Sequence, residues 1–251
     1  MSRALILAIC LLTPVLVSAQ PATQAIQEAM NSDIRSAEDR GRDIYRKPAE
    51  VLTFFGLESD MRVIEIWPFG GWYSKILGPV LRDAGQLYTT QPDLGSYSEA
   101  LEPTLALRGM DRVIKLDYNA REKSNPRDMW VGPAGDWAVA PVDMVLTFQN
   151  YHNLNIDDRM ALNDAIFNAL KPGGIYGVVD HTRRHNQAGA RFNGRRVDPV
   201  LAIKEIQDAG FEFVDYSDLL AMPDDQLILE VGQPEVSGRS DRFVLKFRKP
   251  E

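Results

Sequence analysis

The fold is decided by the stretch Ala169-Leu170-Lys171-Pro172-Gly173-Gly174, which separates a predicted helix from a predicted strand. Residues 157–170 form a helical pattern that ends at this Pro-Gly-Gly turn, and residues 175–179 then form a short apolar run. A second, mainly apolar run, residues 142–148, predicts a buried strand before the helix. Strand, helix and strand in this order predict neighbouring parallel strands joined by a crossover helix.

The same alternation extends in both directions along the chain. The short apolar stretch 61–66 predicts a strand, and further strands are predicted at 86–90, 113–116, 211–214 and 243–247. Helices are predicted at 72–81, at about 97–107, and from the cap and first-turn pair Asp198-Pro199 to Gly210. Continuous apolar strands separated by helices are typical of an α/β fold in which helices cover both faces of the sheet. Two stretches, 121–141 and 223–241, are predicted to be irregular.

The start of the chain has the features of a signal peptide. Met1-Ser2-Arg3 provides a positive charge, residues 4–17 are an almost unbroken apolar run, and Val17-Ser18-Ala19 offers small residues for cleavage. The run is shorter than the roughly 20 residues that cross a bilayer as a helix. We therefore expect cleavage after Ala19, export to a bacterial periplasm and no stable membrane insertion afterwards. The alternative is a cytosolic protein whose N-terminal helix is buried.

Short helices are predicted between this leader and the first strand. Residues 21–32 have helical spacing, Ser36-Ala37-Glu38-Asp39 resembles a capping box, and a further helix begins at Pro48 and ends at Gly56. The predicted organisation is a signal peptide (1–19), an N-terminal helical extension (20–48) and a single α/β domain (49–251).

Composition narrows the class of protein and its partners. The 251 residues are 45% hydrophobic and carry a formal net charge of −7. This is enough apolar material for a core, and an acidic chain lacks the electrostatic footprint of a general nucleic-acid-binding protein. Cys10, the only cysteine, lies in the predicted leader, so the mature chain would have no disulfide, thiolate zinc site or cysteine nucleophile.

From about Leu52 to Lys249 the sequence resembles the class I S-adenosylmethionine-dependent methyltransferases. The resemblance rests on Val63-Ile64-Glu65-Ile66 before a Gly-containing turn, on Val142-Asp143-Met144-Val145-Leu146, on the 169–174 turn and on Ala209-Gly210-Phe211. The exported start, Gly70-Gly71-Trp72-Tyr73 and Val179-Asp180-His181 are similar to a group of exported predicted bacterial methyltransferases. The resemblance implies a Rossmann-like, seven-stranded, mostly parallel sheet whose last strand is antiparallel. It implies a ligand beyond the carboxyl ends of the strands.

The resemblance also implies S-adenosyl-L-methionine as the cofactor and a set of residues that bind it. The family pattern is acidic-x-Gly-x-Gly-x-Gly; aligned from Glu65, Trp67 and Phe69 occupy the first two glycine positions, and Gly71 occupies the third. Gln91 occupies the position of the acid that holds the ribose, with Asp93 close enough to substitute, and Asp117 fits the position beside adenine. The implied cofactor-binding residues are Glu65, Pro68, Gly70, Gly71, Trp72, Gln91, Asp117, Gln149 and Asn150.

Three histidines, His152, His181 and His185, follow the predicted fourth and fifth strands, where the site is expected. Methyl transfer is helped by a base that removes a proton from the acceptor, so His152 or His181 is a candidate base. Asp180 or Tyr151 would orient that base. A histidine metal site with Asp180 is an alternative, although the spacing matches no standard metal motif. In the other alternative, the histidines only cap the ends of strands.

Arginines concentrate in two places in this acidic chain. One group follows His181 and the other lies in the N-terminal helices; together they comprise Arg183, Arg184, Arg191, Arg195 and Arg196, and Arg35, Arg40, Arg42 and Arg46. Guanidinium groups suit carboxylate or phosphate, so an anionic substrate or the cofactor carboxylate is expected between the groups. The alternative is a set of solvated ion pairs with Glu38, Asp39, Asp43 and Asp198. Tyr73, Arg183, Arg184 and His185 are the predicted substrate-binding residues.

Three functions are compatible with these patterns. The first is an exported methyltransferase that acts on a small, possibly anionic, molecule. The second is a catalytically degenerate protein of the same fold that binds a nucleoside-like or anionic metabolite in the periplasm. The third is a different, metal-assisted reaction at the histidine cluster.

Overall fold

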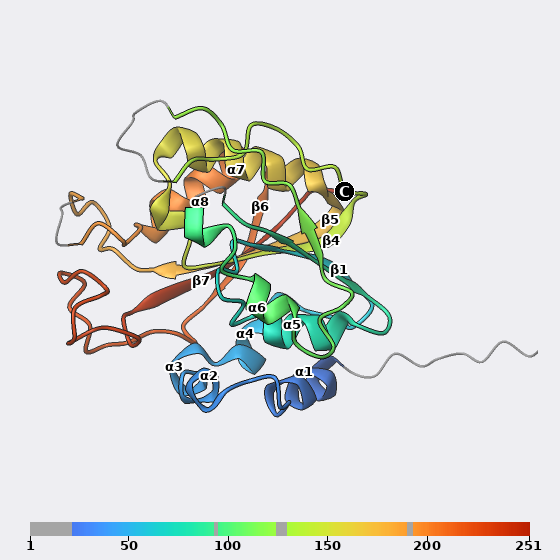
Figure 1. The fold of residues 1–251 in the computed structure, drawn as a ribbon. Coiled ribbons are helices and arrows are strands. Elements are labelled where there is room, and N and C mark those ends of the chain that lie inside the picture. Colours follow the sequence, from blue (N-terminus) through green and yellow to red (C-terminus); the bar gives the residue numbers. More distant parts are fainter. Residues whose placement is uncertain (1–21, 93–94, 124–129, 190–192) are drawn as a thin grey trace, which may run out of the picture.

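The computed structural model describes residues 22–92, 95–123, 130–189 and 193–251, and its centre is a seven-stranded sheet (Figure 1). The strand order is β3-β2-β1-β4-β5-β7-β6. The strands are β1 (Arg62–Ile66), β2 (Gln86–Thr90), β3 (Ile114–Leu116), β4 (Val142–Phe148), β5 (Leu170–His181), β6 (Glu212–Ser217) and β7 (Arg242–Arg248).

β1 to β5 pair in parallel, and β7 is antiparallel to both of its neighbours, β5 and the edge strand β6. The seven-stranded sheet with an antiparallel last strand is therefore confirmed. Because β7 runs the opposite way, it begins at the edge where the parallel strands end. His181, the last residue of β5, pairs with Arg242, the first residue of β7.

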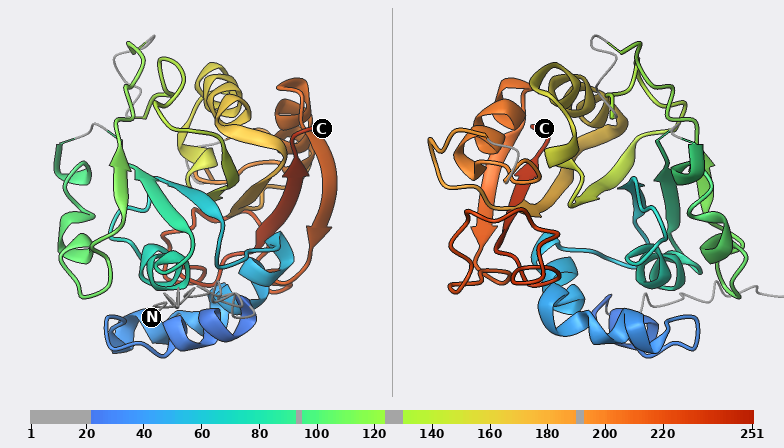
Figure 2. Two further views of the ribbon diagram at one scale, coloured as in Figure 1. Left: turned by 90° about the vertical axis from the view of Figure 1, so that its right-hand side faces the viewer. Right: turned by 60° about the vertical axis from the view of Figure 1, so that its left-hand side comes forward.

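Helices cover both faces of the sheet, as Figure 2 shows. α7 (Ile156–Ala169) and α8 (Pro199–Asp208) pack over one apolar core, which includes Ile166 and Ile206. α1 (Ala22–Met30), α4 (Pro48–Phe55) and α5 (Ser74–Leu81) pack over a second core on the opposite face. The α/β architecture expected from the alternating pattern is thus confirmed.

The N-terminal helices lie against the sheet domain. Ile26 of α1 is buried in the core that α4 and α5 share. α2 (Ala37–Gly41) begins at the predicted capping box, with Ser36 accepting from the N–H of Asp39 and Asp39 accepting from the N–H of Ser36. α3 (Asp43–Arg46) follows at once and leads into α4. These helices carry charged residues to one end of the sheet.

Two local predictions differ from the structure. The helix predicted over 97–107 is replaced by the short turns η1 (Gly95–Tyr97) and α6 (Glu102–Leu105), because Pro103 lacks the N–H that a continuous helix needs at that position. The prediction that the Lys-Pro-Gly-Gly turn separates the helix from the strand is wrong, because these residues belong to β5. Lys249 pairs with Gly173 and Gly174 through backbone hydrogen bonds, which draws residues 170–174 into β5.

No helix within the described residues is long and apolar enough to cross a membrane. The predicted leader, residues 1–19, lies outside the described residues, and the predicted boundary between extension and domain remains a prediction.

Candidate functional site

The turn after β1 keeps the backbone of a glycine-rich loop without most of its glycines. Trp67 has a φ of 47°, Phe69 a φ of 48° and Gly71 a φ of 75°. These are the three positions at which the family pattern has glycine, the residue that adopts positive φ at little cost. The aligned register of the resemblance therefore matches the backbone, with two bulky side chains in place of hydrogen atoms.

Two side-chain amides hold this turn in place. Asn150 donates from Nδ2 to the carbonyls of Ile66 and Trp67, at 2.9 and 3.3 Å. Gln91 accepts from the N–H of Phe69 at 3.3 Å and donates to its carbonyl at 3.0 Å. The predicted cofactor role of Gln91 thus coincides with a structural one, because both ends of its amide bind the loop. Asp93, the predicted substitute, lies outside the described residues.

The glycines at the end of the turn serve different purposes. A Cβ at Gly71 would lie 2.7 Å from Cγ2 of Thr104 and 2.8 Å from Cδ1 of Leu101, so only glycine allows this loop to pack against α6. A Cβ at Gly70 would meet no atom within 4 Å. Close approach to other protein atoms is therefore a property of Gly71, whereas Gly70 borders open space.

A cavity of about 280 Å³ lies beside this turn, at the carboxyl ends of β1 and β4. We call it the front cavity. It contains most of the predicted cofactor-binding residues, together with charged residues from α2 and α3. Its lining is Asp39, Arg42, Arg46, Glu65, Ile66, Trp67, Pro68, Phe69, Gly70, Trp72, Tyr73, Phe148, Gln149 and Asn150.

Glu65 is the buried acid of the front cavity. Burial raises its pKa to about 7, although a 2.6 Å hydrogen bond from Ser74 and the charge of Arg46 act in the opposite direction. Near neutral pH the carboxyl is therefore poised between its two protonation states. A ligand cation that entered the cavity would favour the charged form.

The two aromatic side chains of the turn after β1, Trp67 and Phe69, pack against other aromatic rings. Trp67 is 1% exposed and its ring lies 5.2 Å from that of Tyr118 and 5.4 Å from that of Trp130. The half-buried Phe69 meets Tyr97 and Trp130 edge-on, at 5.7 and 5.6 Å. The ring that replaces the second glycine is thus held by other aromatic rings.

A shallower hollow of about 270 Å³ lies beyond Gln91. It is lined by Gln91 and Pro92 after β2 and by the exposed Asp117 and the buried Tyr118 after β3. The predicted adenine position, Asp117, and the predicted ribose position, Gln91, therefore share one hollow. The loop at Phe69 links this hollow to the front cavity through the Gln91 amide.

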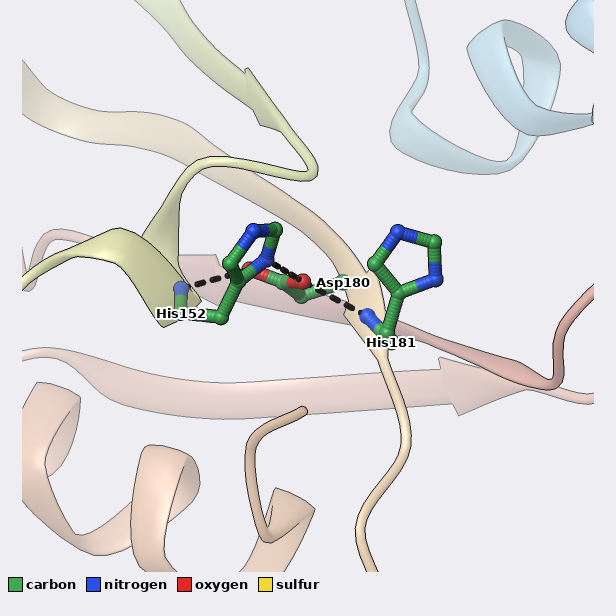
Figure 3. A group of neighbouring side chains, drawn as sticks. All are labelled: His152, Asp180 and His181. Carbon is green, nitrogen blue, oxygen red and sulfur yellow. Dashed lines mark hydrogen bonds and ion pairs between the residues drawn. The ribbon is translucent and has the colours of Figure 1, made fainter. Parts of the chain in front are cut away.

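The structure brings together His152, Asp180 and His181, as Figure 3 shows. Nδ1 of His152 lies 2.6 Å from Oδ1 of Asp180, and the backbone N–H groups of His152 and His181 donate to the same carboxylate at 2.9 and 2.6 Å. Burial alone would raise the pKa of Asp180, but the charge and hydrogen bonds of His152 hold it below its ordinary value. Asp180 is fully buried and ionised, and it fixes the ring of His152.

The same geometry bears on metal binding. Ligand atoms of the three residues lie within 4.8 Å of one another. However, both carboxylate oxygens of Asp180 already accept N–H bonds, and a metal ion would compete with these donors. The arrangement favours a histidine–aspartate pair over a metal centre.

His181 differs from His152 in its environment. It is 8% exposed, and its Nδ1 lies 2.7 Å from the hydroxyl of Ser240. Burial lowers its pKa to about 3, because the Asp180 charge only partly offsets the loss of water. His181 is therefore a neutral imidazole at physiological pH and a weak base.

Other predicted site residues lie elsewhere. Tyr151 is fully buried, and its hydroxyl bonds to Glu205 and Asn163, so it does not orient either histidine. His185 pairs with Asp198 at 2.9 Å. Arg183, Arg184 and His185 line neither the front cavity nor the hollow, and the backbone N–H of Arg183 donates to the carbonyl of Val197. Arg191 lies outside the described residues.

Tyr73 and Trp72, by contrast, face the front cavity. Tyr73 stacks on Phe148 with a ring separation of 3.6 Å and an interplanar angle of 9°. Trp72 donates from Nε1 to the carbonyl of Asp39 and carries the guanidinium of Arg46 over its ring at 4.5 Å. These two aromatics hold α2 and α3 over the cavity.

The arginines divide into two sets. Arg35 pairs with Asp43, a partner that the ion-pair alternative names, but Arg35 is buried and not solvated. Arg196 pairs with Asp225, which that alternative does not name, and this pair is also buried. Arg46 and Arg242 are different: within the parts of the chain that the structure describes, neither makes an ion pair with a carboxylate. Arg242 is not among the site residues predicted from the sequence. The signal for it was available, since the first residue of an antiparallel last strand lies at the same edge as the site.

No protein-family model matches the sequence, and no curated protein matches it. Solved structures with the same fold are found at low sequence identity. A SAM-dependent methyltransferase from Aquifex aeolicus is 15% identical with a TM-score of 0.58, over 90% of this chain and 97% of that one. The [4+2]-cyclase SpnF is 18% identical with a TM-score of 0.55, over 92% and 97%.

A third solved structure is the glycopeptide N-methyltransferase MtfA, complexed with S-adenosyl-L-homocysteine. It is 14% identical with a TM-score of 0.54, over 82% of this chain and 90% of that one. At such identities the likeness concerns the arrangement of strands and helices. The chain therefore has the Rossmann-like fold of the class I S-adenosylmethionine-dependent methyltransferases.

Proposed function

We propose that this protein is an S-adenosylmethionine-dependent methyltransferase that acts on a small molecule, with anionic acceptors as the first class to test. The observation that carries the proposal is the backbone of the turn after β1. Its three pattern positions, Trp67, Phe69 and Gly71, all have positive φ. A non-glycine residue held at positive φ is strained, and such strain is concentrated at functional sites. The glycopeptide N-methyltransferase with S-adenosyl-L-homocysteine supports the choice of cofactor.

The charges around the front cavity fit the amino-acid end of this cofactor. Glu65 would accept hydrogen bonds from the ammonium group, and Arg42 and Arg46 would bind the carboxylate. Oδ1 of Asn150 is a further acceptor, since the residue is 1% exposed and this atom has no partner among the described residues. The hollow that contains Gln91 and Asp117 would hold the adenosine half.

When bound, the cofactor supplies a methyl group on a sulfonium leaving group. The contribution of the protein is then to hold the acceptor in line, and such positioning is worth up to about 7–11 kcal/mol. Trp72 and Tyr73 keep α2 and α3 over the front cavity, which limits the entry of water.

We assign the role of general base to His152, oriented by Asp180. Its ring is fixed with Nδ1 toward the carboxylate, which leaves Nε2 to accept a proton. His152 lines neither the front cavity nor the hollow; its ring lies 5.5 Å from that of His181. Ligand nitrogens of the two histidines lie within 4.8 Å, a separation that one water molecule can bridge. His181 would pass the proton rather than keep it.

Calorimetry with the mature chain, residues 20–251, tests the proposal. We expect both S-adenosylmethionine and S-adenosylhomocysteine to bind. Glu65→Gln should weaken binding, because the amide cannot carry the negative charge that the ammonium needs. The matched control is Glu212→Gln, the same chemical change in an exposed ion pair with Arg248. Absence of binding at millimolar concentration of either compound would rule the proposal out.

A second candidate function is favoured by the rings of Trp67 and Phe69, which occupy space that glycine leaves open. In this alternative the protein binds a nucleoside-like or anionic metabolite without transferring a methyl group. The [4+2]-cyclase with a similar fold illustrates that this architecture is not confined to methyl transfer. Mass spectrometry of a co-purified ligand, followed by an assay for methyl-donor turnover, separates the two functions.

The compartment is part of the proposal. The predicted leader would export the protein, while S-adenosylmethionine is made in the cytoplasm. N-terminal sequencing of protein from the periplasmic fraction should begin at Gln20. A full-length chain that begins at Met1 and stays in the cytoplasm would contradict export and remove the conflict with cofactor supply.

A further inference from the structure

A second chamber adjoins the front cavity on the side of β5 and β7. Its volume is about 180 Å³, and we call it the rear chamber. It is bordered by α3, by the ends of β4 and β5, by the start of β7 and by the loop before β7. Its lining is Arg42, Arg46, Gln149, His181, Arg195, Val231, Gly232, Ser237, Gly238, Ser240 and Arg242. The two spaces share Arg42, Arg46 and Gln149.

The charge of the rear chamber is strongly positive. Four of its lining residues are arginines, and the lining contains no Asp or Glu. This contrasts with the chain as a whole, whose formal net charge is −7. Only Arg195 has a carboxylate partner among the described residues, Glu230, and that pair lies at the exposed rim.

Arg242 is the most deeply buried of these cations. It is 3% exposed and donates to two backbone carbonyls, those of Ser240 and Tyr45. Carbonyl groups satisfy hydrogen bonds but do not neutralise the charge. A buried charge without a counter-ion is costly, and the cost is removed when an anion binds beside it. Burial accordingly lowers the pKa of Arg242, and it lowers that of Arg46 to about 10.

The neutral groups of the chamber also suit an anion. His181 is uncharged, and Ser240 lies 2.7 Å from its Nδ1. When the Ser240 hydroxyl donates to Nδ1, the proton of the neutral ring is on Nε2, which then acts as a donor. Donors therefore outnumber acceptors around this space.

We propose that the rear chamber holds the oxyanion group, a carboxylate or a phosphate, of the methyl acceptor. Arg242 would bind it through its guanidinium group, and Arg46, which borders both spaces, would lie between this anion and the carboxylate of the methyl donor in the front cavity. This inference rests on the proposed function and specifies its substrate class. The chamber is smaller than the roughly 300–1,000 Å³ of a typical ligand pocket, so the anionic part of the acceptor is small.

Arg242 distinguishes binding of the acceptor anion from binding of the cofactor carboxylate. Arg42 and Arg46 border both spaces and would also bind the carboxylate of the cofactor, whereas Arg242 borders only the rear chamber. Removing the charge of Arg242 should therefore weaken an acceptor anion and leave cofactor binding nearly unchanged.

The test is calorimetric titration of the mature chain with inorganic phosphate and, separately, acetate, with chloride keeping the ionic strength constant. We expect at least one of the two anions to bind the wild-type protein, and binding should weaken at least tenfold in Arg242→Gln. Arg239→Gln is the matched control, because it removes the same charge from an exposed residue of the neighbouring loop that does not line the chamber. Each variant is also titrated with S-adenosylhomocysteine.

Because Arg242 is buried, a second variant keeps the test independent of folding. Ser237 is exposed and lines the chamber, so Ser237→Glu should place a carboxylate among the arginines and weaken anion binding. Ser237→Gln introduces a side chain of nearly the same size as Ser237→Glu but without the charge, and it should weaken anion binding much less. Equal anion affinity in Ser237→Glu and Ser237→Gln would overturn the inference.

Titration of S-adenosylhomocysteine into protein saturated with the anion completes the design. Independent binding of the two supports separate sites. Displacement of the anion by S-adenosylhomocysteine would mean that the arginines serve the cofactor carboxylate, which overturns the inference and leaves the proposed function in place. Binding of S-adenosylhomocysteine with no binding of either anion has the same meaning. Anion binding without S-adenosylhomocysteine binding would instead overturn the proposed function, and the acceptor role with it.

Discussion

Two regions of the molecule treat buried charge in opposite ways. Where the segment after β5 meets the loop before β7, Arg196 and Asp225 are almost completely buried, and Nη2 of Arg196 donates to both carboxylate oxygens of Asp225 at 3.0 and 2.9 Å. At the edge of the sheet, Glu65, Arg46 and Arg242 are buried or half-buried and have no partner of opposite charge in direct contact among the described residues. Charge that is compensated inside the protein fixes a loop, whereas the uncompensated charges border the two cavities in which we propose that ligands bind.

The largest effect is expected where the compensated pair is broken. Asp225→Asn leaves the guanidinium of Arg196 buried without a counter-ion, and breaking such a pair typically costs about 3–5 kcal/mol. Asp225 also accepts from the N–H groups of Leu227 and Asp241, so the loop before β7 depends on it. Urea unfolding measures the loss. The control is Glu230→Gln at the exposed Arg195 pair, which should cost at most about 1 kcal/mol. Equal losses in the two variants would contradict the comparison.

The next effect concerns two histidine–aspartate pairs of similar geometry. His152 is held by Asp180 beside the rear chamber, and His185 is held by Asp198 outside it. If His152 is the base, His152→Ala should lower methyl-donor turnover by about 100-fold or more, with little change in cofactor affinity. His185→Ala should leave turnover close to wild type. The measurement is formation of S-adenosylhomocysteine with an acceptor found among small carboxylates and phosphates. A His152→Ala protein that keeps most of its activity would disprove the assignment.

A smaller effect follows from the uncompensated acid. Burial raises the pKa of Glu65 to about 7, so below that pH the free protein holds a proton that a bound ammonium group must displace. The affinity for S-adenosylmethionine should therefore be about tenfold lower at pH 6 than at pH 8, with release of a proton on binding. Calorimetry in two buffers of different ionisation enthalpy measures both quantities. Glu65→Gln should bind more weakly and lose the pH dependence; a wild-type affinity independent of pH would sink the assigned role.

The sequence predicts the parts of this site that depend on apolar pattern and turn chemistry. The strands at 86–90 and 142–148 have the predicted bounds, because each is rich in the Val, Tyr, Thr and Phe residues that favour strands and each follows a Gly or a Pro. The conformation of the turn after β1 was harder to predict, since Trp67 and Phe69 do not favour positive φ and are held there by the Asn150 and Gln91 amides. Those contacts join residues far apart in the chain.

The rear chamber illustrates the same limit. Its arginines come from α3 and the residue before it, from the segment after β5 and from the start of β7. Composition alone does not distinguish Arg242 from the paired Arg196. What separates them is whether a carboxylate folds against each one. Such pairing is a property of tertiary packing, which is why the sequence placed substrate binding at Arg183 and Arg184 instead.

The smallest effect on folding is expected from a substitution of Arg46. This substitution is the sharpest test of the contrast between compensated and uncompensated buried charge. Arg46→Met removes a charge that has no carboxylate partner, and the charges of Arg42 and Arg242 oppose it. The variant loses the contact of the guanidinium with the Trp72 ring and a 3.3 Å bond to Gln149, but it also loses the cost of desolvation. These contributions are of similar size, so the free energy of unfolding should change by no more than about 1 kcal/mol. Urea unfolding with and without phosphate separates the two roles: phosphate should stabilise the wild-type protein more than the variant. A loss as large as that of Asp225→Asn would mean that Arg46 is part of the scaffold and not of a binding site.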